Sequence, residues 1–469
     1  MEMGDIMEQV TQEMFKQWVL KQQLDPLLEI KEEDNAILLE TECAKGKIRF
    51  YEMNIVELSA ESKIDGESVF YLHFQLNTME HAQELFHELC DCIIKVKKEE
   101  IHKILLSCTA GFTTAFFAEK LNEAFELLGL KYHVEAVFYE ELFNVAEEYE
   151  LICIAPQIGY KLNEIHQRLP HANAIKIPSN IFAKYDAGEM IKLIQTYIEK
   201  PVEAKIERPN AYRDLEHHDQ PILCLNIIRN SRRTHIAYAI YDANNFVVQY
   251  DNVVKPKVYL SDIYDAIDIC LVNYPDICCI GLSLPGIIHK DRFISANYVN
   301  GLNNHNLDEL FTQKYHKPFI FSNDANAAAV GFYSTNTEYE SISFIYQPLY
   351  YRAGIGSVVN GKLLTGAHNL SGELKLLPIE LSKPFIELIK EPGGAIEIVT
   401  KQVIALMTTI DPEAIVICSS LIPDVNVIKD ELLRYFGHEE YLPDLIRQER
   451  FHASLFLGQL ILCIESIQK

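Results

Sequence analysis

The sequence predicts an α/β protein of three successive parts: an N-terminal α+β module over residues 1–98, a parallel-sheet domain over 101–200 and a longer α/β unit over 218–469. The main observation behind this prediction is a change in the period of the apolar residues. Near the N-terminus apolar and polar residues alternate, whereas further on short apolar runs alternate with helical stretches. A chain of 469 residues that is 48% hydrophobic is also long enough for about three domains.

The first part begins with a helical pattern and continues with strands. Residues 35–43 (NAILLETEC), 46–58 (GKIRFYEMNIVEL) and 68–76 (SVFYLHFQL) alternate apolar and polar side chains, which is typical of an antiparallel meander. Residues 79–96 (MEHAQELFHELCDCIIKV) then predict a helix that closes the module. The charged run at 95–100 marks a boundary. No motif identifies the function of this module, and an output or assembly role is the expectation.

The second part alternates strands and helices. Its apolar runs are KILLSC (103–108), HVEAVF (133–138), ELICIAP (150–156) and NAIKIP (173–178), and helical stretches separate them. This βαβα order predicts a four-stranded parallel sheet with flanking helices.

The loop after the first of these strands is a candidate site. Cys108 ends the strand, and a helix is predicted to begin near Thr113. Ligand sites in open parallel sheets lie at the carboxyl ends of strands, where a helix N-terminus favours negative charge. We therefore expect Cys108 to carry a phosphoryl group on its sulfur, although a buried cysteine in an ordinary turn is the alternative. The expected phosphate loop comprises Thr109, Ala110, Gly111, Phe112, Thr113 and Thr114.

Residues 108–115 (CTAGFTTA), 149–170 (YELICIAPQIGYKLNEIHQRLP) and 182–191 (FAKYDAGEMI) resemble the enzyme IIB domain of the lactose/cellobiose group of the bacterial sugar phosphotransferase system. In that family the cysteine accepts phosphate from a phosphohistidine on enzyme IIA and passes it to sugar at a membrane enzyme IIC. The resemblance implies that Cys108 is the phosphocysteine and that IIA is a partner, and it leaves IIC open as a second partner. Ala155 replaces a glycine that is frequent in the family, which does not remove the nucleophile.

Four ordered motifs mark the third part: LSLPGII (282–288), FSNDANAAAVG (321–331), AGIGSVVNGKLLTGAHNLSGE (353–373) and IDPEAIVI (410–417). Together they resemble the ROK family of sugar kinases and sugar-responsive repressors. The resemblance implies the two-lobed, actin-like α/β fold of sugar kinases.

The same resemblance implies a sugar site. Asn323 and Asp324 match the NDAN motif of the family, whose aspartate acts as general base on the sugar hydroxyl. Glu373 matches a sugar-binding glutamate, and Gly286 and Asn297 are assigned to the same site. Asp324 would be catalytic only if the domain is an active kinase. The alternative for this motif is a strand-to-helix turn in which Asp324 caps the helix.

The nucleotide side of the site departs from the family pattern. Asn226 replaces the acidic residue of the D-x-G-G-T phosphate loop, and Ile228 and Arg229 fall near the missing glycines. A turn that cradles phosphate with backbone N–H groups is therefore not expected, and neither is kinase activity. Residues 418–420 (CSS) replace the adenosine-side glycines, and Leu376 occupies the place of the usual zinc-ligand histidine. We thus expect no metal and no cofactor.

Composition narrows the function classes further. The net charge of −25 disfavours binding to phosphate backbones, so no direct DNA binding is expected. Residues 1–14 lack an apolar signal core, and the longest apolar stretch, 454–464, is shorter than the ~20 residues of a membrane span. Eleven irregularly spaced cysteines suit reduced thiols. These observations predict a cytoplasmic protein.

The leading interpretation is a sugar-responsive regulatory protein, with Cys108 as phosphoryl acceptor and a kinase-inactive ROK-like domain as sensor of a sugar or sugar phosphate. Two enzymatic alternatives stay open. The chain could be a genuine IIB carrier for a separate membrane IIC, or an ATP-dependent sugar kinase with unusual loops. The sequence identifies neither the sugar nor the oligomeric state, and a homo-oligomer is compatible with it.

Overall fold

The structure of the protein is a computed structural model, and its described residues form two compact units. Both contain helices and strands, which confirms the predicted α/β class. One unit comprises Met1–Lys97 together with Glu203–Lys469, and the other comprises Lys98–Val202. The second unit is therefore an insertion into the first. The described residues are 10–33, 35–64, 66–96, 102–109, 112–128, 130–169, 173–198, 208–209, 215–216, 218–229, 233–295, 298–348, 351–389, 393–422 and 424–468.

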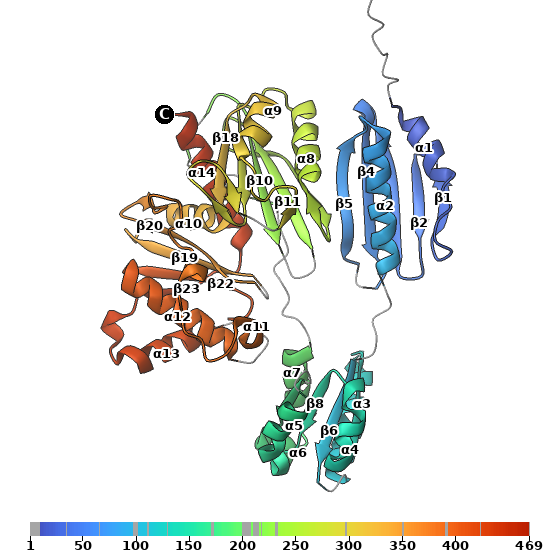
Figure 1. Ribbon diagram of the computed structural model, residues 1–469, viewed down its shortest axis with the longest axis vertical. Helices are drawn as coiled ribbons and strands as arrows, with labels where there is room; N and C mark the ends of the chain where they lie inside the picture. The colour runs from blue at the N-terminus through green and yellow to red at the C-terminus, as the bar shows by residue number, and fades with distance from the viewer. Residues whose placement is uncertain are drawn as a thin grey trace, which may run out of the picture. The chain divides into compact units, whose positions relative to one another are not determined.

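The N-terminal module is an antiparallel meander with two helices on one of its faces (Figure 1). Phe70, Leu72 and Phe74 alternate along one strand and are buried in the core that the helices cover. The run predicted over 46–58 is divided into two strands, because Met53 and Asn54 adopt positive φ angles and reverse the chain. The elements are α1 (Gln12–Leu20), β1 (Glu29–Glu33), β2 (Ala36–Glu40), β3 (Ala44–Tyr51), β4 (Ile55–Ser62), β5 (Ser68–Gln75) and α2 (Met79–Lys95).

The sheet of this module continues into the C-terminal part of the chain. The strand order is β1-β2-β3-β4-β5-β12-β11-β10-β14-β18. Among the described residues only one aligned pair, Val254 with Tyr71, joins β5 to β12. We call this junction the seam. The elements that follow it are β10 (Ile222–Arg229), β11 (Thr234–Tyr241), β12 (Val247–Lys255), α8 (Leu260–Asn273), β14 (Cys279–Leu284) and β18 (Phe319–Asn323).

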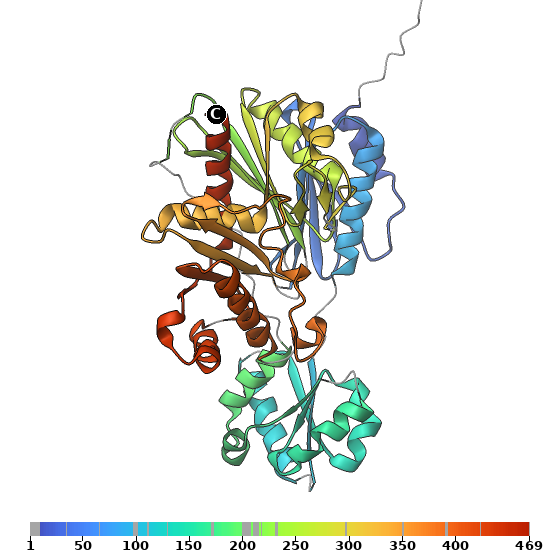
Figure 2. The same ribbon diagram turned by 60° about the vertical axis from the view of Figure 1, so that its left-hand side comes forward.

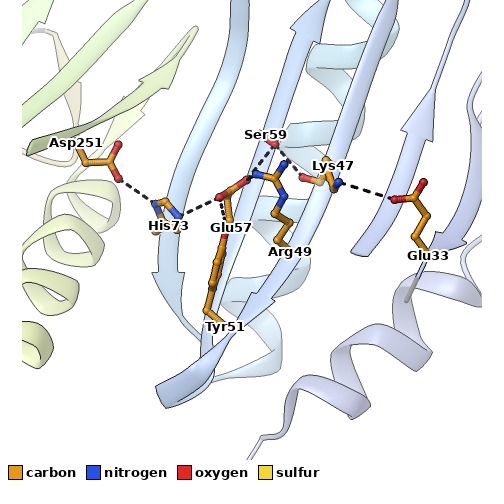
Figure 3. Close-up of polar contacts among 8 residues, drawn as sticks. All are labelled: Glu33, Lys47, Arg49, Tyr51, Glu57, Ser59, His73 and Asp251. Atoms are coloured by element: carbon orange, nitrogen blue, oxygen red, sulfur yellow. Dashed lines mark hydrogen bonds and ion pairs between the residues drawn. The ribbon is translucent and has the colours of Figure 1, made fainter. Parts of the chain in front are cut away.

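Ion pairs hold the seam where the backbone ladder is short. His73 of β5 lies between Glu57 of β4, at 3.3 Å, and Asp251 of β12, at 3.2 Å (Figure 3). Glu57 also receives hydrogen bonds from Arg49 and Tyr51, each at 2.7 Å. The carboxylate of Glu57 is nearly inaccessible to solvent, so these contacts compensate the cost of its burial.

A second set of charges joins the helices on the opposite face. Lys255, whose side chain is 1% exposed, contacts Glu88 of α2 and lies 2.7 Å from Asp262 of α8. His81 of α2 lies 2.8 Å from Asp265 of α8. Apolar residues of the module and of the C-terminal part also share one core. The module is therefore packed as an extension of the first C-terminal lobe.

The C-terminal part contains two lobes of the same topology. In its first lobe the strands follow the order third, second, first, fourth and fifth (β12-β11-β10-β14-β18), and the second lobe repeats this order as β21-β20-β19-β22-β23. This repetition is the two-lobed, actin-like arrangement that the resemblance implied. The elements are β19 (Ile342–Gln347), β20 (Gly354–Val359), β21 (Lys362–Leu363), α12 (Gly394–Thr409), β22 (Ala414–Ser419), α13 (Asn426–Phe436) and β23 (Asp444–Arg447).

Two helices, α10 (Asp324–Thr335) and α14 (Phe451–Ile467), pack between the two sheets (Figure 1). Glycines permit their close contact. A Cβ atom at Gly331 would lie 1.9 Å from the carbonyl oxygen of Ser454, and one at Gly458 would lie 1.7 Å from that of Ala327. The lobes are therefore joined by a tightly packed core, and the open part of the cleft lies at the carboxyl ends of the strands.

The inserted unit has the predicted four-stranded parallel sheet, in the order β7-β6-β8-β9, with helices on both faces (Figure 2). The strand β6, which carries Cys108, is one of the two inner strands. The elements are β6 (His102–Cys108), α3 (Phe112–Leu128), β7 (Tyr132–Phe138), α4 (Tyr139–Val145), β8 (Leu151–Ile154), α5 (Leu162–Arg168), β9 (Ala174–Lys176), α6 (Ser179–Lys184) and α7 (Ala187–Ile198).

Candidate functional sites

The first candidate site surrounds Cys108, at the carboxyl end of β6. Its side chain is 2% exposed, and its Sγ lies 3.1 Å from Oγ1 of Thr114 and 3.9 Å from Oγ1 of Thr113. Both threonines belong to the first turn of α3, so the thiol faces the N-terminus of a 17-residue helix. Thr109 is exposed. The predicted loop residues Ala110 and Gly111 lie outside the described residues, as does the side chain of Phe112.

The neighbouring strand ends complete this edge of the sheet. The N–H of Ala155 donates to the carbonyl of Ser107 at 2.9 Å, and the PQIGY segment forms a short 3₁₀ helix, Pro156–Lys161, directly after β8. On the other side Phe138 is in register with Cys108 and is half exposed. Sequence reasoning missed Phe138. The sequence feature that could have indicated it is its position as an aromatic residue at the end of the apolar run 133–138, which follows the cysteine strand in the chain.

The second candidate site is a cavity of about 320 Å³ between the two C-terminal lobes. Three of the predicted sugar-site residues, Gly286, Asn323 and Glu373, line it. Asn297 lies outside the described residues. Sequence reasoning did not single out His289, Asn369 and Ser371, which also line the cavity. The AHNLSGE segment contains two of them, so its polar residues before Glu373 were the available signal.

Asn323 fixes the geometry of this cavity. Its Oδ1 accepts hydrogen bonds from the N–H groups of Ala325 and Asn326, and its Nδ2 donates to the carbonyl of Gly286 at 2.7 Å. The helix cap at this turn is thus Asn323, and Asp324 is the first residue of α10. Because Asn323 caps the helix, the side chain of Asp324 is not needed for capping. Asp324 lies at the junction of β18 and α10, directly after the carboxyl end of a parallel strand.

Asp324 is buried, and burial raises its pKa to about 7. The hydrogen bond from the Ala325 N–H opposes this rise, whereas the negative charge of Glu373 adds to it. Glu373 itself pairs with Lys375 at 3.0 Å. A carboxyl group that changes protonation state near neutral pH suits proton transfer or a hydrogen bond to a ligand hydroxyl.

Two glycines of β20 bring the second lobe close to Asp324. A Cβ atom at Gly354 would lie 3.7 Å from Oδ1 of Asp324, and one at Gly356 would lie 2.3 Å from the carbonyl oxygen of Ala325. These glycines of β20 therefore allow the strand to pack on the start of α10. This packing accounts for them without any contact to a nucleotide.

The structure places the altered nucleotide-side residues within regular strands. Asn226 is 0% exposed, and neither polar atom of its amide has a partner among the described residues. Ile227 and Ile228 are also buried, and β10 continues to Arg229 without a glycine turn. Cys418 is buried within β22.

Across the part of the chain that the structure describes, no three His, Cys, Asp or Glu side chains are placed to hold a metal ion. No helix within the same ranges is sufficiently long and apolar to span a bilayer.

Two regions of the chain match models of protein families. Residues 103–192 match the model of the lactose/cellobiose-specific IIB subunit of the phosphotransferase system, and residues 232–381 match the model of the ROK family. The chain therefore contains one region that matches the IIB family model and a second region that matches the ROK family model.

Similar proteins include a curated relative and solved structures for each region. The xylose repressor of Bacillus subtilis (strain 168) is 30% identical over 105 residues, which are 22% of this chain and 27% of the repressor. The chain thus spans about a quarter of that relative. The ROK hexokinase of Thermus thermophilus matches 53% of this chain and 99% of its own (TM-score 0.43, 17% identity). The lactose-specific IIB component domain of Streptococcus pneumoniae matches 22% of this chain and 100% of its own (TM-score 0.20, 17% identity).

Proposed function

We propose that this protein is a cytoplasmic, sugar-responsive regulator linked to the phosphotransferase system. Cys108 accepts a phosphoryl group from a IIA protein, and the interlobe cavity binds a sugar or sugar phosphate without ATP-dependent kinase activity. The observation that carries the proposal is the presence of both sites in one chain: a thiol facing the start of α3 and a polar cavity next to Asp324.

The chemistry of the two sites supports these roles. A phosphoryl group on the Cys108 sulfur would receive hydroxyl hydrogen bonds from the threonines and the favourable dipole of α3. Asn323 and Glu373 line the cavity with an amide and a carboxylate of the kind that bind sugar hydroxyls, and the buried Asp324 directly follows Asn323 in the chain. By contrast, the buried Asn226 and the unbroken strand β10 provide no phosphate cradle.

Phosphoryl transfer tests the first role. Labelled phosphoenolpyruvate, enzyme I, HPr and a IIA protein of the lactose/cellobiose type should place acid-stable label on the wild-type chain, and Cys108→Ser should abolish it. Cys43→Ser, a partly exposed thiol in the N-terminal module, is the matched control and should leave labelling unchanged. Label on another residue, or no label, would exclude Cys108 as the acceptor.

Ligand-induced thermal stabilisation tests the second role. A ligand that binds only the folded state stabilises it by about 2.7 kcal/mol at a hundred times its dissociation constant. We expect at least one hexose, N-acetylhexosamine, disaccharide or phosphorylated derivative to raise the melting temperature. Asp324→Ala and Glu373→Ala should each remove the shift, whereas Cys108→Ser should retain it. A shift that persists in both alanine variants would place the ligand elsewhere.

Two enzymatic functions compete with this proposal. The complete four-stranded IIB fold also suits a phosphoryl carrier for a separate membrane IIC, and deletion of the gene would then abolish uptake of the sugar rather than only its regulation. The pKa of Asp324, near 7, also suits a general base. Transfer of phosphate from ATP to a hexose, lost in Asp324→Asn, would favour a sugar kinase.

A further inference from the structure

Arg229 is in an unusual position at the end of β10. Its guanidinium carbon lies 4.0 Å from the ring centre of Tyr351 and 4.8 Å from that of Tyr298. The two rings are 6.3 Å apart and nearly perpendicular. Among the described residues no carboxylate pairs with this guanidinium within 4 Å. Its contacts are therefore cation–π interactions with both rings.

This cluster joins the two lobes. Arg229 and Tyr298 belong to the first lobe, whereas Tyr351 belongs to the second, where it precedes β20. Tyr351 is itself anchored, because its N–H donates to the carbonyl of Pro348 at 3.2 Å and its carbonyl accepts a hydrogen bond from Gln347. We call these three residues, Arg229, Tyr298 and Tyr351, the arginine clamp.

The clamp and the cavity lie at the same edge of the first-lobe sheet. Because β10, β14 and β18 are parallel neighbours, their carboxyl ends meet at one edge, and these ends lead to Arg229, Gly286 and Asn323. The cavity has walls from both lobes. Gly286 and Asn323 belong to the first, and Ile355 and Glu373 belong to the second. Any separation of the lobes at this edge would pull the two walls apart.

We propose that Arg229 is a positioning residue that holds the two walls of the cavity together, at the strand end that lacks the glycine turn of the ROK phosphate loop. In this arrangement a side chain of the protein supplies the contact across the cleft. The inference deepens the proposed sugar-binding function, and it predicts a cavity that is kept closed in the absence of nucleotide.

Hydrogen–deuterium exchange on the full-length, ligand-free chain tests this proposal. Loss of both cation–π contacts in Arg229→Ala should accelerate exchange of peptides from 286–292 and 363–373 by about tenfold. Tyr351→Ala should reproduce the effect. Tyr351→Phe keeps the ring and should behave as the wild type. Arg434→Ala, on the exposed face of α13, is the matched arginine control.

Unchanged exchange in both Arg229→Ala and Tyr351→Ala would overturn the proposal. So would an equal effect of Tyr351→Phe, because the hydroxyl rather than the ring would then be responsible. Exchange of peptides from 36–75 in the N-terminal module should stay constant and shows that each variant is folded. If Arg229→Ala fails to fold, Tyr351→Leu provides the same test. The exchange measurement needs no sugar. A failed ligand screen would therefore argue against the proposed sugar binding, whereas the exchange rates would still show whether the arginine clamp holds the lobes together.

Discussion

Replacement of Glu57 by glutamine tests the ion network at the seam. Burial by itself would raise the pKa of Glu57, but hydrogen bonds from His73 and Tyr51 and the charge of Arg49 lower it from 4.5 to about 2. That decrease corresponds to ~3 kcal/mol of stabilisation, since each pKa unit is worth about 1.4 kcal/mol. Glutamine keeps an oxygen acceptor, so we expect Glu57→Gln to lower the free energy of unfolding by ~2 kcal/mol at pH 7.

The effect should depend on pH in both directions. A lowered carboxyl pKa stabilises the fold above pH 4.5, and the stabilisation is lost as the pH falls towards 2. Burial by itself would lower the pKa of His73, but hydrogen bonds to Asp251 and Glu57 raise it to about 9. The contribution of His73 is therefore complete below pH 6.5 and is lost as the pH rises through 9. The difference in the free energy of unfolding between wild type and Glu57→Gln should therefore be largest between pH 4.5 and pH 6.5.

Urea unfolding followed by tryptophan fluorescence is the appropriate assay. Trp18 is the only tryptophan of the sequence, and it packs in α1 against Phe86 of α2, so its emission reports on the N-terminal module. Glu33→Gln is the matched control, because Glu33 is half exposed and lies 3.8 Å from Lys47 (Figure 3). It should change the stability by less than ~0.5 kcal/mol. Equal stabilities of Glu57→Gln and wild type at pH 7, or a difference that grows on acidification, would refute the reasoning.

Three further changes have defined outcomes. Thr114→Val should slow phosphorylation of Cys108 by about tenfold, because the Thr114 hydroxyl lies 3.1 Å from the sulfur, and Thr114→Ser should keep the wild-type rate. Equal rates in Thr114→Val and wild type would show that this hydroxyl is not used. Asp324→Asn should be more stable than wild type at pH 8 in urea, because a raised carboxyl pKa lowers stability as the pH rises from 3.8 through 7; a less stable variant would contradict this. Gly458→Ala should lower the free energy of unfolding by ~2–3 kcal/mol, and the melting temperature with it, because its methyl group would collide with the Ala327 carbonyl. Gly188→Ala is the control and should have little effect, because a methyl group has room there.

The sequence was informative wherever a local pattern determines the structure. The four apolar runs of the inserted unit became four parallel strands because each run is short, apolar and separated from the next by a helical stretch. The position of Cys108 followed from the same pattern. The ROK motifs placed Asn323 and Glu373 in one cavity, although they are 50 positions apart in the sequence.

Features that depend on distant backbone contacts were not predictable in this way. No sequence signal showed that β5 lies beside β12, because an edge strand can pair with any available partner and the alternation of its residues specifies only which face is buried. The run over 46–58 gave only a weak signal of its reversal, since Asn54 favours a positive φ angle but Met53 rarely adopts one. The arginine clamp joins three residues that are far apart in the chain.

The seam also gives the N-terminal module a physical role that its sequence does not reveal. The inserted unit follows α2 in the chain and precedes β10, and both of these elements belong to the same compact unit. If the module were attached only by its linker, the inserted unit would be a free spacer between two separate bodies. The buried contacts of Lys255 with Glu88 and Asp262, together with the shared apolar core, instead fix both of its attachment points to one body. The module thus supplies the second anchor of the domain that carries Cys108.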